Sequence, residues 1–426
     1  MSKKKILVYP CGTEIGLEVY RSLRYSTHYE LWGGSCSYDH GRFVFENHID
    51  DLPFITDRSN ADEIREFDEK IKDYGFDFIY PVMDGVITVF SKYRDCLTPV
   101  VIASDYSATE ITRSKRKTYE KLGDVVATPK VYNFKAEITE YPVFKKPDVG
   151  QGSSGAMKIN DETELLDSFF TDGKSMVLEY MPGEEYTIDC LTNRRGELVY
   201  ARARGRRRIK GGISVNAVFV DRPEFFEIAK RINEALPQVG GWFFQLKEAA
   251  DGSLKLLEVA SRIAGTSGIT RATGVNLPLL TANIFNGIDV DSVIINDYDI
   301  ELDRALGNSF RVDLDYTDVY VDYDDTMVVD NQVNLEMITF LYKCFNEGKR
   351  LVLLTHHDGE LQPLLNKYRL TQIFDEIIHI NRGIPKYKYV TGEKPVFIDD
   401  SYGERKEVAE NCGCPVFDTH TIEALL

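Results

Sequence analysis

The sequence VYVDYDDTMV, residues 319–328, joins a strand-like apolar run to a cluster of acids. The run is rich in β-branched residues and stops at Asp322 and Asp324, which are two positions apart. Because alternate side chains of an extended strand share a face, both carboxylates are predicted to point to one place, with Thr326 just beyond them. Two converging carboxylates bind a hard divalent cation such as Mg²⁺. One carboxylate can also attack phosphorus while the other handles protons.

Two further apolar strands follow in the sequence, RLVLLT at 350–355 and PVFID at 395–399. Each ends in a polar residue, and a Gly-Ile-Pro turn lies between them. Because strands alternate with helical segments, we expect an open parallel sheet whose site lies at the carboxyl ends of its strands. The polar residues at those ends and after the turn are Thr355, Lys386, Lys388, Asp399 and Asp400.

In this order, the motifs of residues 315–426 resemble those of the haloacid dehalogenase-like (HAD) phosphohydrolase superfamily. The resemblance implies that Asp322 is a nucleophile that becomes an aspartyl-phosphate, and that Asp324 is the general acid/base. It also implies a Mg²⁺ site made by Asp322, Asp324 and Asp399, with Asp400 beside it.

The same resemblance implies that Thr355 binds the phosphoryl group and that Lys386 steadies its negative charge. Lys388 is an alternative to Lys386, because spacing alone does not choose between them. No insertion long enough for a cap domain separates the motifs. The resemblance therefore implies a capless Rossmann-like domain whose site is open or is covered by another part of the chain.

The length, charge and cysteine content of the chain exclude several classes of protein. A chain of 426 residues has room for roughly two to four domains. Its net charge of −17 argues against general binding to nucleic-acid phosphates. Its seven cysteines are odd in number and form no CxxC pair, which indicates reduced thiols. MSKKKILVY at the N-terminus is no signal peptide, and no apolar stretch reaches the ~18 residues that span a membrane. We therefore expect a cytoplasmic protein without nucleic-acid or membrane partners.

The first part of the chain alternates strand-like and helix-like patterns. Apolar strands are predicted at KILVY (5–9), within FDFIYPVMDG (76–85) and at PVVIAS (99–104). This alternation predicts an open parallel sheet over residues 1–108.

Residues 109–310 differ in character, with hairpin-like strands, a glycine-rich loop and long amphipathic helices. The stretch FKKPDVGQGSSGAM (144–157) places Lys145 and Lys146 before a loop of glycines and serines. Closely spaced backbone N–H groups in such a loop suit polyphosphate oxygens, and the preceding lysine adds a positive charge. No Gly-Lys-Ser/Thr follows, so the loop is not a P-loop.

Two more stretches of this region carry candidate binding residues. In MVLEYMPGEEYTIDCL (176–191), a strand with Glu179 leads to a Pro-Gly bend and then to Glu185. A hinge of this kind can present backbone groups to an adenine and a carboxylate to a ribose. The run ARARGRRRIKGG (201–212) is the densest positive stretch and can bind phosphates or an acidic substrate.

The stretch WFFQLKEAADGSLKLLEVASRIAGTSG (242–268) predicts a hairpin around an Asp-Gly turn. Gln245 and Glu258 lie at the strand ends, and Arg262 follows them. The carboxylate of Glu258 is a candidate metal ligand.

Together these features resemble the ATP-grasp superfamily, and most of all the branch of carbamoyl-phosphate synthase and the carboxylate–amine ligases. The resemblance covers about residues 1–308 and implies ATP clamped between two α+β subdomains. The implied phosphate contacts are Lys117, Lys146, and the loop from Gly150 to Gly155 with Gly152, Ser153 and Ser154. The implied adenine and ribose contacts are Glu179, Tyr180 and Glu185.

The resemblance also implies that Glu258 holds Mg²⁺ and that Arg262 stabilises the transferred phosphoryl group. The family often reads Glu-x-Asn-x-Arg, whereas residues 258–262 are EVASR, and Ala260 cannot ligate a metal. One Mg²⁺ is then held less tightly, or another side chain replaces the missing ligand. The candidates for that replacement are Gln245 and Glu248.

We therefore predict an α/β and α+β multidomain protein with a pre-ATP-grasp domain (1–108), an ATP-grasp domain (109–310) and a HAD-like domain (315–426). The predicted activity joins a small-molecule carboxylate to an amine through an acyl-phosphate, using ATP and Mg²⁺. A fused Mg²⁺-dependent phosphatase is predicted to act on a phosphorylated small molecule of the same pathway. The residues predicted to bind the substrate are Arg206, Arg208 and Lys210.

Two further expectations concern assembly and an alternative function. The ATP-grasp resemblance implies pairing of two chains through the N-terminal half. The alternative is a nucleotide-binding sensor or scaffold in which one or both catalytic domains are inactive, and Ala260 is its best support.

Overall fold

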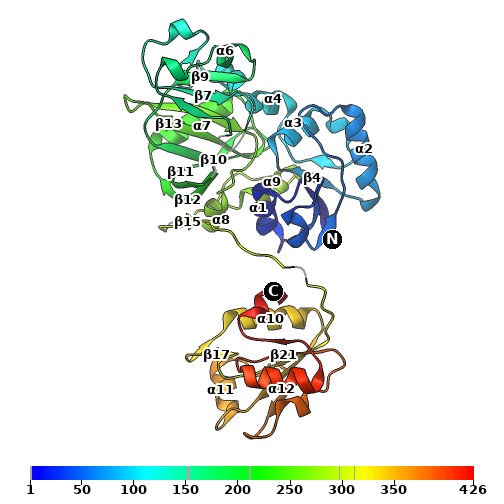
Figure 1. Ribbon diagram of the computed structural model, residues 1–426. Coiled ribbons are helices and arrows are strands. Elements are labelled where there is room, and N and C mark those ends of the chain that lie inside the picture. Colours follow the sequence, from blue (N-terminus) through cyan, green and yellow to red (C-terminus); the bar gives the residue numbers. More distant parts are fainter. Residues whose placement is uncertain (1, 151–153, 211–212, 297, 311) are drawn as a thin grey trace. The chain divides into compact units, whose positions relative to one another are not determined.

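The computed structural model describes residues 2–150, 154–210, 213–296, 298–310 and 312–426. The chain forms two compact units, residues 1–306 and 307–426 (Figure 1). Within the described ranges, every helix is too short or too polar to traverse a lipid bilayer.

The first unit begins with a parallel sheet. Its elements are β1 (Lys4–Tyr9), α1 (Glu14–Leu23), β2 (Tyr29–Gly34), β3 (Asn47–Ile49), α2 (Ala61–Ile71), β4 (Phe78–Pro81), α3 (Asp84–Lys92) and β5 (Val100–Val101). The strand order is β3-β2-β1-β4-β5, and all pairs are parallel. The apolar side chains of β1 are buried on both faces, as expected for a strand between two layers of helices. The predicted open parallel sheet is confirmed.

A four-stranded antiparallel sheet follows. Its region contains α4 (Tyr106–Arg113), α5 (Lys115–Leu122), β6 (Val131–Tyr132), β7 (Val143–Pro147), β8 (Met157–Ile159), α6 (Ser168–Thr171) and β9 (Ser175–Glu179). The strand order is β6-β9-β7-β8.

A six-stranded antiparallel sheet completes the first unit. Its region contains β10 (Glu185–Thr192), β11 (Leu198–Lys210), β12 (Ile213–Val220), α7 (Pro223–Ala235), β13 (Gly240–Glu248), β14 (Leu254–Ala260), α8 (Gly268–Ala272), α9 (Leu277–Phe285) and β15 (Glu301–Asp303). The strand order is β14-β13-β10-β11-β12-β15. Trp242 and Phe244 alternate with Phe243 and Gln245 along β13, so the first pair enters the core beneath α7 and the second pair faces the opposite side.

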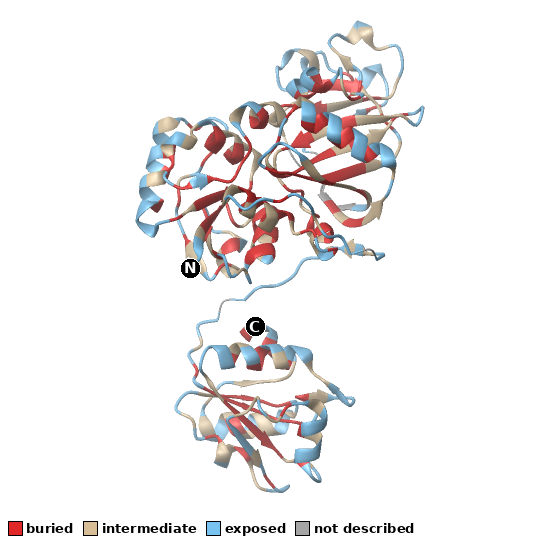
Figure 2. Cartoon of the chain, turned by 180° about the vertical axis from the view of Figure 1, so that it is seen from behind, coloured by how far each residue is buried: buried red, intermediate tan, exposed pale blue. Residues whose placement is uncertain are grey.

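The second unit is another parallel sheet. Its elements are β16 (Asp318–Val321), β17 (Val328–Val329), β18 (Gln332–Val333), α10 (Leu335–Asn346), β19 (Arg350–Thr355), α11 (Leu361–Tyr368), β20 (Glu376–His379), β21 (Pro395–Ile398), α12 (Tyr402–Cys412) and β22 (Val416–Phe417). The order is β20-β19-β16-β21-β22, so the chain builds first to one side of β16 and then to the other. Buried residues concentrate on the sheet and on the inner sides of the helices (Figure 2).

The boundary between the two units follows Leu306. The N-terminal parallel sheet and the two antiparallel sheets belong to one unit, and the predicted division of that unit at residues 108 and 109 stays a prediction.

Candidate functional site

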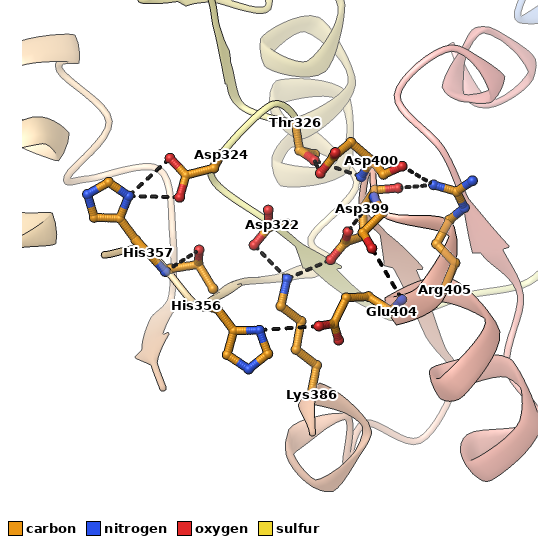
Figure 3. Close-up of polar contacts among 12 residues, drawn as sticks. Asp322, Asp324, Thr326, His356, His357, Lys386, Asp399, Asp400, Glu404 and Arg405 are labelled. Atoms are coloured by element: carbon orange, nitrogen blue, oxygen red, sulfur yellow. Dashed lines mark hydrogen bonds and ion pairs between the residues drawn. The ribbon is translucent and has the colours of Figure 1, made fainter. Parts of the chain in front are cut away.

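In the second unit, the carboxyl ends of β16 and β21 bring together Asp322, Lys386 and Asp399 (Figure 3). The Lys386 ammonium donates hydrogen bonds to Asp322 Oδ1 at 2.7 Å and to Asp399 Oδ2 at 2.6 Å, and all three side chains are buried. The strand order reverses between β16 and β21, and open sheets bind their ligands at such a point. Lys388 is exposed, so the structure distinguishes the two candidate lysines by position.

Burial sets the electrostatics of this cluster. It raises the pKa of Asp322, and together with the charge of Asp322 it raises the pKa of Asp399 to about 6. Burial alone would lower the pKa of Lys386, but the two carboxylates hold it above its ordinary value. The three charges are therefore tolerated in the interior only because they touch one another.

The same cluster offers oxygen donors for a metal ion. Carboxylate oxygens of Asp322, Asp399 and Asp400 lie within 4.8 Å of one another. Asp400 is positioned through its backbone, whose N–H donates to the Thr326 hydroxyl at 3.0 Å and whose carbonyl accepts from Arg405 at 2.7 Å. Such a set of carboxylates suits Mg²⁺.

The carboxylate of Asp324 lies apart from this metal cluster, which differs from the sequence prediction. β16 ends at Val321, and Asp325 adopts a left-handed φ of 53°, so the two-residue alternation of a strand does not extend to Asp324. The carboxylate of Asp324 is instead half exposed and lies 2.8 and 3.0 Å from Nδ1 of His357. Asp322 and Asp324 therefore face different partners (Figure 3).

Thr355 lies at the end of β19, as the sequence predicts. Its hydroxyl accepts the backbone N–H of His357 at 3.2 Å, and its hydrogen bond to Asp322 lowers the pKa of that carboxyl against the larger effect of burial. His357 was not singled out by the sequence, although it lies two positions beyond Thr355.

The first unit contains a cavity of about 810 Å³. Its walls come from the two antiparallel sheets and from the carboxyl edge of the N-terminal sheet. The predicted site residues that line it are Lys146, Ser154, Glu179, Tyr180, Glu185, Arg206, Gln245, Glu258 and Arg262. Gly152 and Ser153 lie outside the described residues, as does the side chain of Lys210.

Positive charge gathers at one part of the cavity. The buried Lys146 ammonium donates hydrogen bonds to the Tyr119 hydroxyl at 2.7 Å and to the Leu257 carbonyl at 3.1 Å. Burial, reinforced by the charge of Lys115, lowers the pKa of Lys146 to about 7. Two lysines that repel each other in a cavity form a site that an anion stabilises.

Lys117 does not line the cavity, and Lys115 takes that place. The two residues begin α5 and are two positions apart, so their side chains point roughly 200° from one another around the helix. Lys117 is half exposed and forms an ion pair with Glu110 at 2.6 Å. Lys115 instead lies 3.8 Å from Glu258.

The hinge residues after β9 are partly committed to other partners. Glu179 accepts the backbone N–H of Lys130 at 2.7 Å and pairs with Lys255 at 2.5 Å. The ring of Tyr180 lies 4.6 Å from the ammonium of Lys158. Both hinge residues line the cavity, but the carboxylate of Glu179 already has two donors.

The basic strand β11 turns only some of its arginines toward the cavity. Arg206 lines it and pairs with Glu185, which also lies 3.8 Å from Lys247. Arg208 is exposed and pairs with Asp303 at 2.6 Å, because irregular pairing with β12 on both sides of Arg208 interrupts the alternation.

Gln245 and Glu258 are direct partners on the neighbouring strands β13 and β14, so two oxygen donors lie side by side in the cavity. Gln245 also donates to the Thr187 hydroxyl at 3.3 Å. Glu248 does not line the cavity, and its carboxylate binds Arg222 at 2.9 Å and the Tyr186 hydroxyl at 3.0 Å. Gln245 is therefore the better placed of the two candidates to compensate for Ala260.

Arg262 connects the cavity to the N-terminal sheet. Its Nε and Nη2 donate to the two oxygens of Asp84 at 2.7 and 2.8 Å, and Asp84 begins α3 directly beyond β4. The remaining Nη1 donates to the Ile263 carbonyl at 3.1 Å.

Comparisons with known proteins agree with this architecture. Residues 171–304 match the sequence model of a family described as ATP-grasp in the biosynthetic pathway with Ter operon. The biotin carboxylase domain of Hydrogenobacter thermophilus 2-oxoglutarate carboxylase, solved with MgADP and bicarbonate, is similar in structure. It is 16% identical with a TM-score of 0.56, over 68% of this chain and 71% of that one.

Two other solved structures show the same fold. N5-carboxyaminoimidazole synthetase from Staphylococcus aureus, complexed with ADP, is 14% identical, with a TM-score of 0.56 over 69% of this chain and 80% of that one. L-amino acid ligase from Bacillus licheniformis is 17% identical, with a TM-score of 0.52 over 68% of this chain and 75% of that one. No curated protein matches the sequence.

The chain contains an ATP-grasp domain. The HAD resemblance of residues 315–426 stays a prediction, since the family match ends at residue 304.

Several side chains that line the cavity of the first unit were not found from the sequence. The period of two along β11 and β13 could have found Arg204 and Lys247, which share a face with Arg206 and Gln245. Thr13 and Glu14, at the start of α1, carry no comparable signal, because only the packing of the N-terminal sheet brings them to the cavity.

Proposed function

We propose that residues 1–306 form an ATP-dependent ligase that joins a carboxylate to an amine. The proposal rests on the position of Lys146, which is buried and lines an 810 Å³ cavity together with a second lysine, Lys115. A bound polyanion would stabilise both positive charges. A nucleoside triphosphate supplies that anion, and the hinge beside Tyr180 offers backbone groups to its base.

The proposed reaction has two balanced steps. A carboxylate oxygen of the substrate attacks the γ-phosphorus of ATP, and ADP leaves. The amine nitrogen then attacks the acyl carbon, phosphate leaves, and the amide loses a proton. The sum is carboxylate, amine and ATP giving amide, ADP and phosphate.

The residues of the chain contribute mainly charge and position. Lys115 and Lys146 neutralise phosphate oxygens where charge develops, which is a large source of rate in phosphoryl transfer. Gln245 and Glu258 offer paired oxygen donors that fit Mg²⁺, which screens the phosphates when bound. Of Arg206, Arg207 and Arg208, Arg206 lines the cavity and is the candidate to orient the substrate carboxylate.

ADP formation from Mg²⁺-ATP in the presence of a panel of carboxylates and amines tests the ligase. Lys146→Met should lower kcat about 10²–10³-fold, since a positioned charge is lost. Lys117→Met is the matched control, because Lys117 is half exposed and lies outside the cavity, and it should keep the parent rate. Tight ATP binding with no turnover for any substrate pair would instead favour the sensor.

We also propose that residues 315–426 form a Mg²⁺-dependent phosphatase. The supporting observation is the buried Asp322, Lys386 and Asp399 cluster at the point where the strand order reverses. Asp322 attacks phosphorus and the alcohol leaves. Water then attacks the aspartyl-phosphate to release phosphate and restore the carboxylate. Lys386 holds the charge of the phosphoryl oxygens, and Asp324 handles the protons.

Hydrolysis of a generic phosphate ester tests the phosphatase. Asp322→Asn should abolish turnover and leave ligation intact. Asp325→Asn is the matched control, because Asp325 is exposed and asparagine tolerates its left-handed φ of 53°. Equal rates for Asp322→Asn and the parent would exclude the aspartyl-phosphate route.

A further inference from the structure

A third group of side chains with possible metal ligands lies outside both proposed sites, at the carboxyl edge of the N-terminal sheet. Cys11 follows β1, Asp39 follows β2, and His48 belongs to β3. The Sγ atom, a carboxylate oxygen and a ring nitrogen of these residues lie within 4.8 Å of one another. Cys11 is fully buried, and the side chain of His48 is only 8% exposed.

The hydroxyl of Ser35 lies among these three groups. Its Oγ is 3.2 Å from Cys11 Sγ, 3.0 Å from Asp39 Oδ1 and 3.0 Å from His48 Nε2. In a tetrahedral site with bonds of about 2.0–2.3 Å, neighbouring donor atoms are roughly 3.3–3.7 Å apart. The three distances to Ser35 are therefore slightly shorter than this spacing, and the other three donors lie within 4.8 Å of one another, so a modest adjustment places them around an ion.

The surroundings of His48 match those of a metal-bound histidine. Its Nδ1 lies 3.3 Å from Asp50 Oδ1, and Arg42 holds the other oxygen of Asp50 at 2.6 Å. A carboxylate on the far ring nitrogen fixes the orientation of a ligating imidazole and raises its basicity. The backbone N–H of Gly41 likewise fixes Asp39, donating to Oδ1 at 2.8 Å.

Two glycines allow the chain to close around the donors. A Cβ atom at Gly12 would lie 2.2 Å from Asp39 Cγ, and one at Gly41 would lie 2.2 Å from Cys11 Sγ. Neither glycine has a positive φ, so the requirement is one of space. The backbone therefore forms a cradle that brings the side chains of Cys11 and Asp39 together.

Ser35, His48 and Asp50 also have the order of a hydrolase relay, but Ser35 is 1% exposed, so a substrate does not reach its hydroxyl. An ion needs no such access once the chain has folded around it.

We propose that Cys11, Asp39 and His48 bind one Zn²⁺ or a similar divalent transition-metal ion, with the Ser35 oxygen in the fourth position. Thiolate and imidazole ligands favour such an ion over Mg²⁺, so this site differs in chemistry from the two magnesium sites. The ion links the segments that follow β1 and β2 to strand β3. Cys11 lies two residues before Thr13, which caps α1 and lines the nucleotide cavity, so the ion also braces one wall of that cavity.

Cobalt binding to the full-length protein tests the site without reference to either activity. The protein is stripped with a chelator and titrated with Co²⁺ in excess Mg²⁺, which occupies the hard oxygen sites. We expect one Co²⁺ per chain, a thiolate-to-cobalt charge-transfer band, and loss of the band when Zn²⁺ is added. A parent protein without the band would overturn the proposal.

Variants then assign the ligands. Cys11→Ser should abolish the band, whereas Cys414→Ser, at a cysteine of the other unit, should keep it. His48→Gln should weaken Co²⁺ binding at least about 100-fold, and Asp50→Asn about 10–100-fold. If Cys11→Ser fails to fold, His48→Gln decides by itself, since parent affinity in that variant would also overturn the site.

Discussion

The lowered pKa of Lys146 predicts that the protein takes up a proton when it binds a nucleotide. In the free protein, burial and the charge of Lys115 lower the pKa of Lys146 from 10.5 to about 7. Phosphate oxygens beside the ammonium favour its charged form, so binding returns the pKa toward its ordinary value. A return over the whole range corresponds to about 5 kcal/mol of interaction between the charge and its new surroundings.

This change in pKa determines how nucleotide affinity depends on pH. Between pH 7 and 10 the free lysine is mostly neutral and the bound lysine is charged, so affinity falls as the pH rises. At pH 8, uptake should reach about 0.9 protons per bound nucleotide. From pH 7.5 to 9 the apparent Kd for MgADP should rise about 25-fold.

Calorimetry of MgADP binding in buffers of different ionisation enthalpy measures the uptake as a slope. Lys146→Arg keeps a positive charge that does not titrate in this range, so its slope should fall to near zero. Lys117→Met should keep the parent slope. A binding enthalpy of the parent that does not depend on the buffer at pH 8 would refute the reasoning.

Three other perturbations have defined outcomes. Arg204→Met leaves the buried Asp189 without its ion pair and should lower the free energy of unfolding of the first unit, measured in urea, by about 3–5 kcal/mol. Adding Asp189→Leu should recover most of this loss, and equal unfolding midpoints for all three proteins would contradict the prediction. Because the pKa of Asp399 is about 6, Mg²⁺ affinity of the second unit should fall as the pH drops below that value, and a pH-independent Kd from calorimetry would argue otherwise. Gly41→Ala should displace Cys11 Sγ, remove the cobalt band and lower stability by about 1–3 kcal/mol, and an unchanged band would count against the cradle.

The sequence predicts the sheets well because each depends on local patterns. Short apolar runs at 5–9, 350–355 and 395–399 become buried parallel strands, and alternation along β13 separates a core face from a cavity face. These patterns fix which side a residue faces wherever the strand is regular.

The prediction of the sites is weaker where regular structure ends. Asp324 lies beyond the last residue of β16, and Arg208 lies where the pairing of β11 with β12 is irregular. Lys117 points away from the cavity, because the direction of a side chain on a helix depends on its position around the helix axis. The packing of the whole sheet decides which distant segments meet. It places Thr13 in the wall of the cavity and brings Cys11 close to His48.

The strand order shared by the two parallel sheets has an evolutionary consequence. In each sheet, residues of a candidate site lie just beyond the first and fourth strands: Glu14 and Met83 in the first unit, and Asp322 and Asp399 in the second. Substrate preference can therefore drift through replacements at positions such as 14 and 83, which line the cavity but are only partly buried, at a smaller cost in folding than replacements in the core. A library randomised there should contain many well-folded members with altered selectivity, whereas one randomised at 6–8 should contain few.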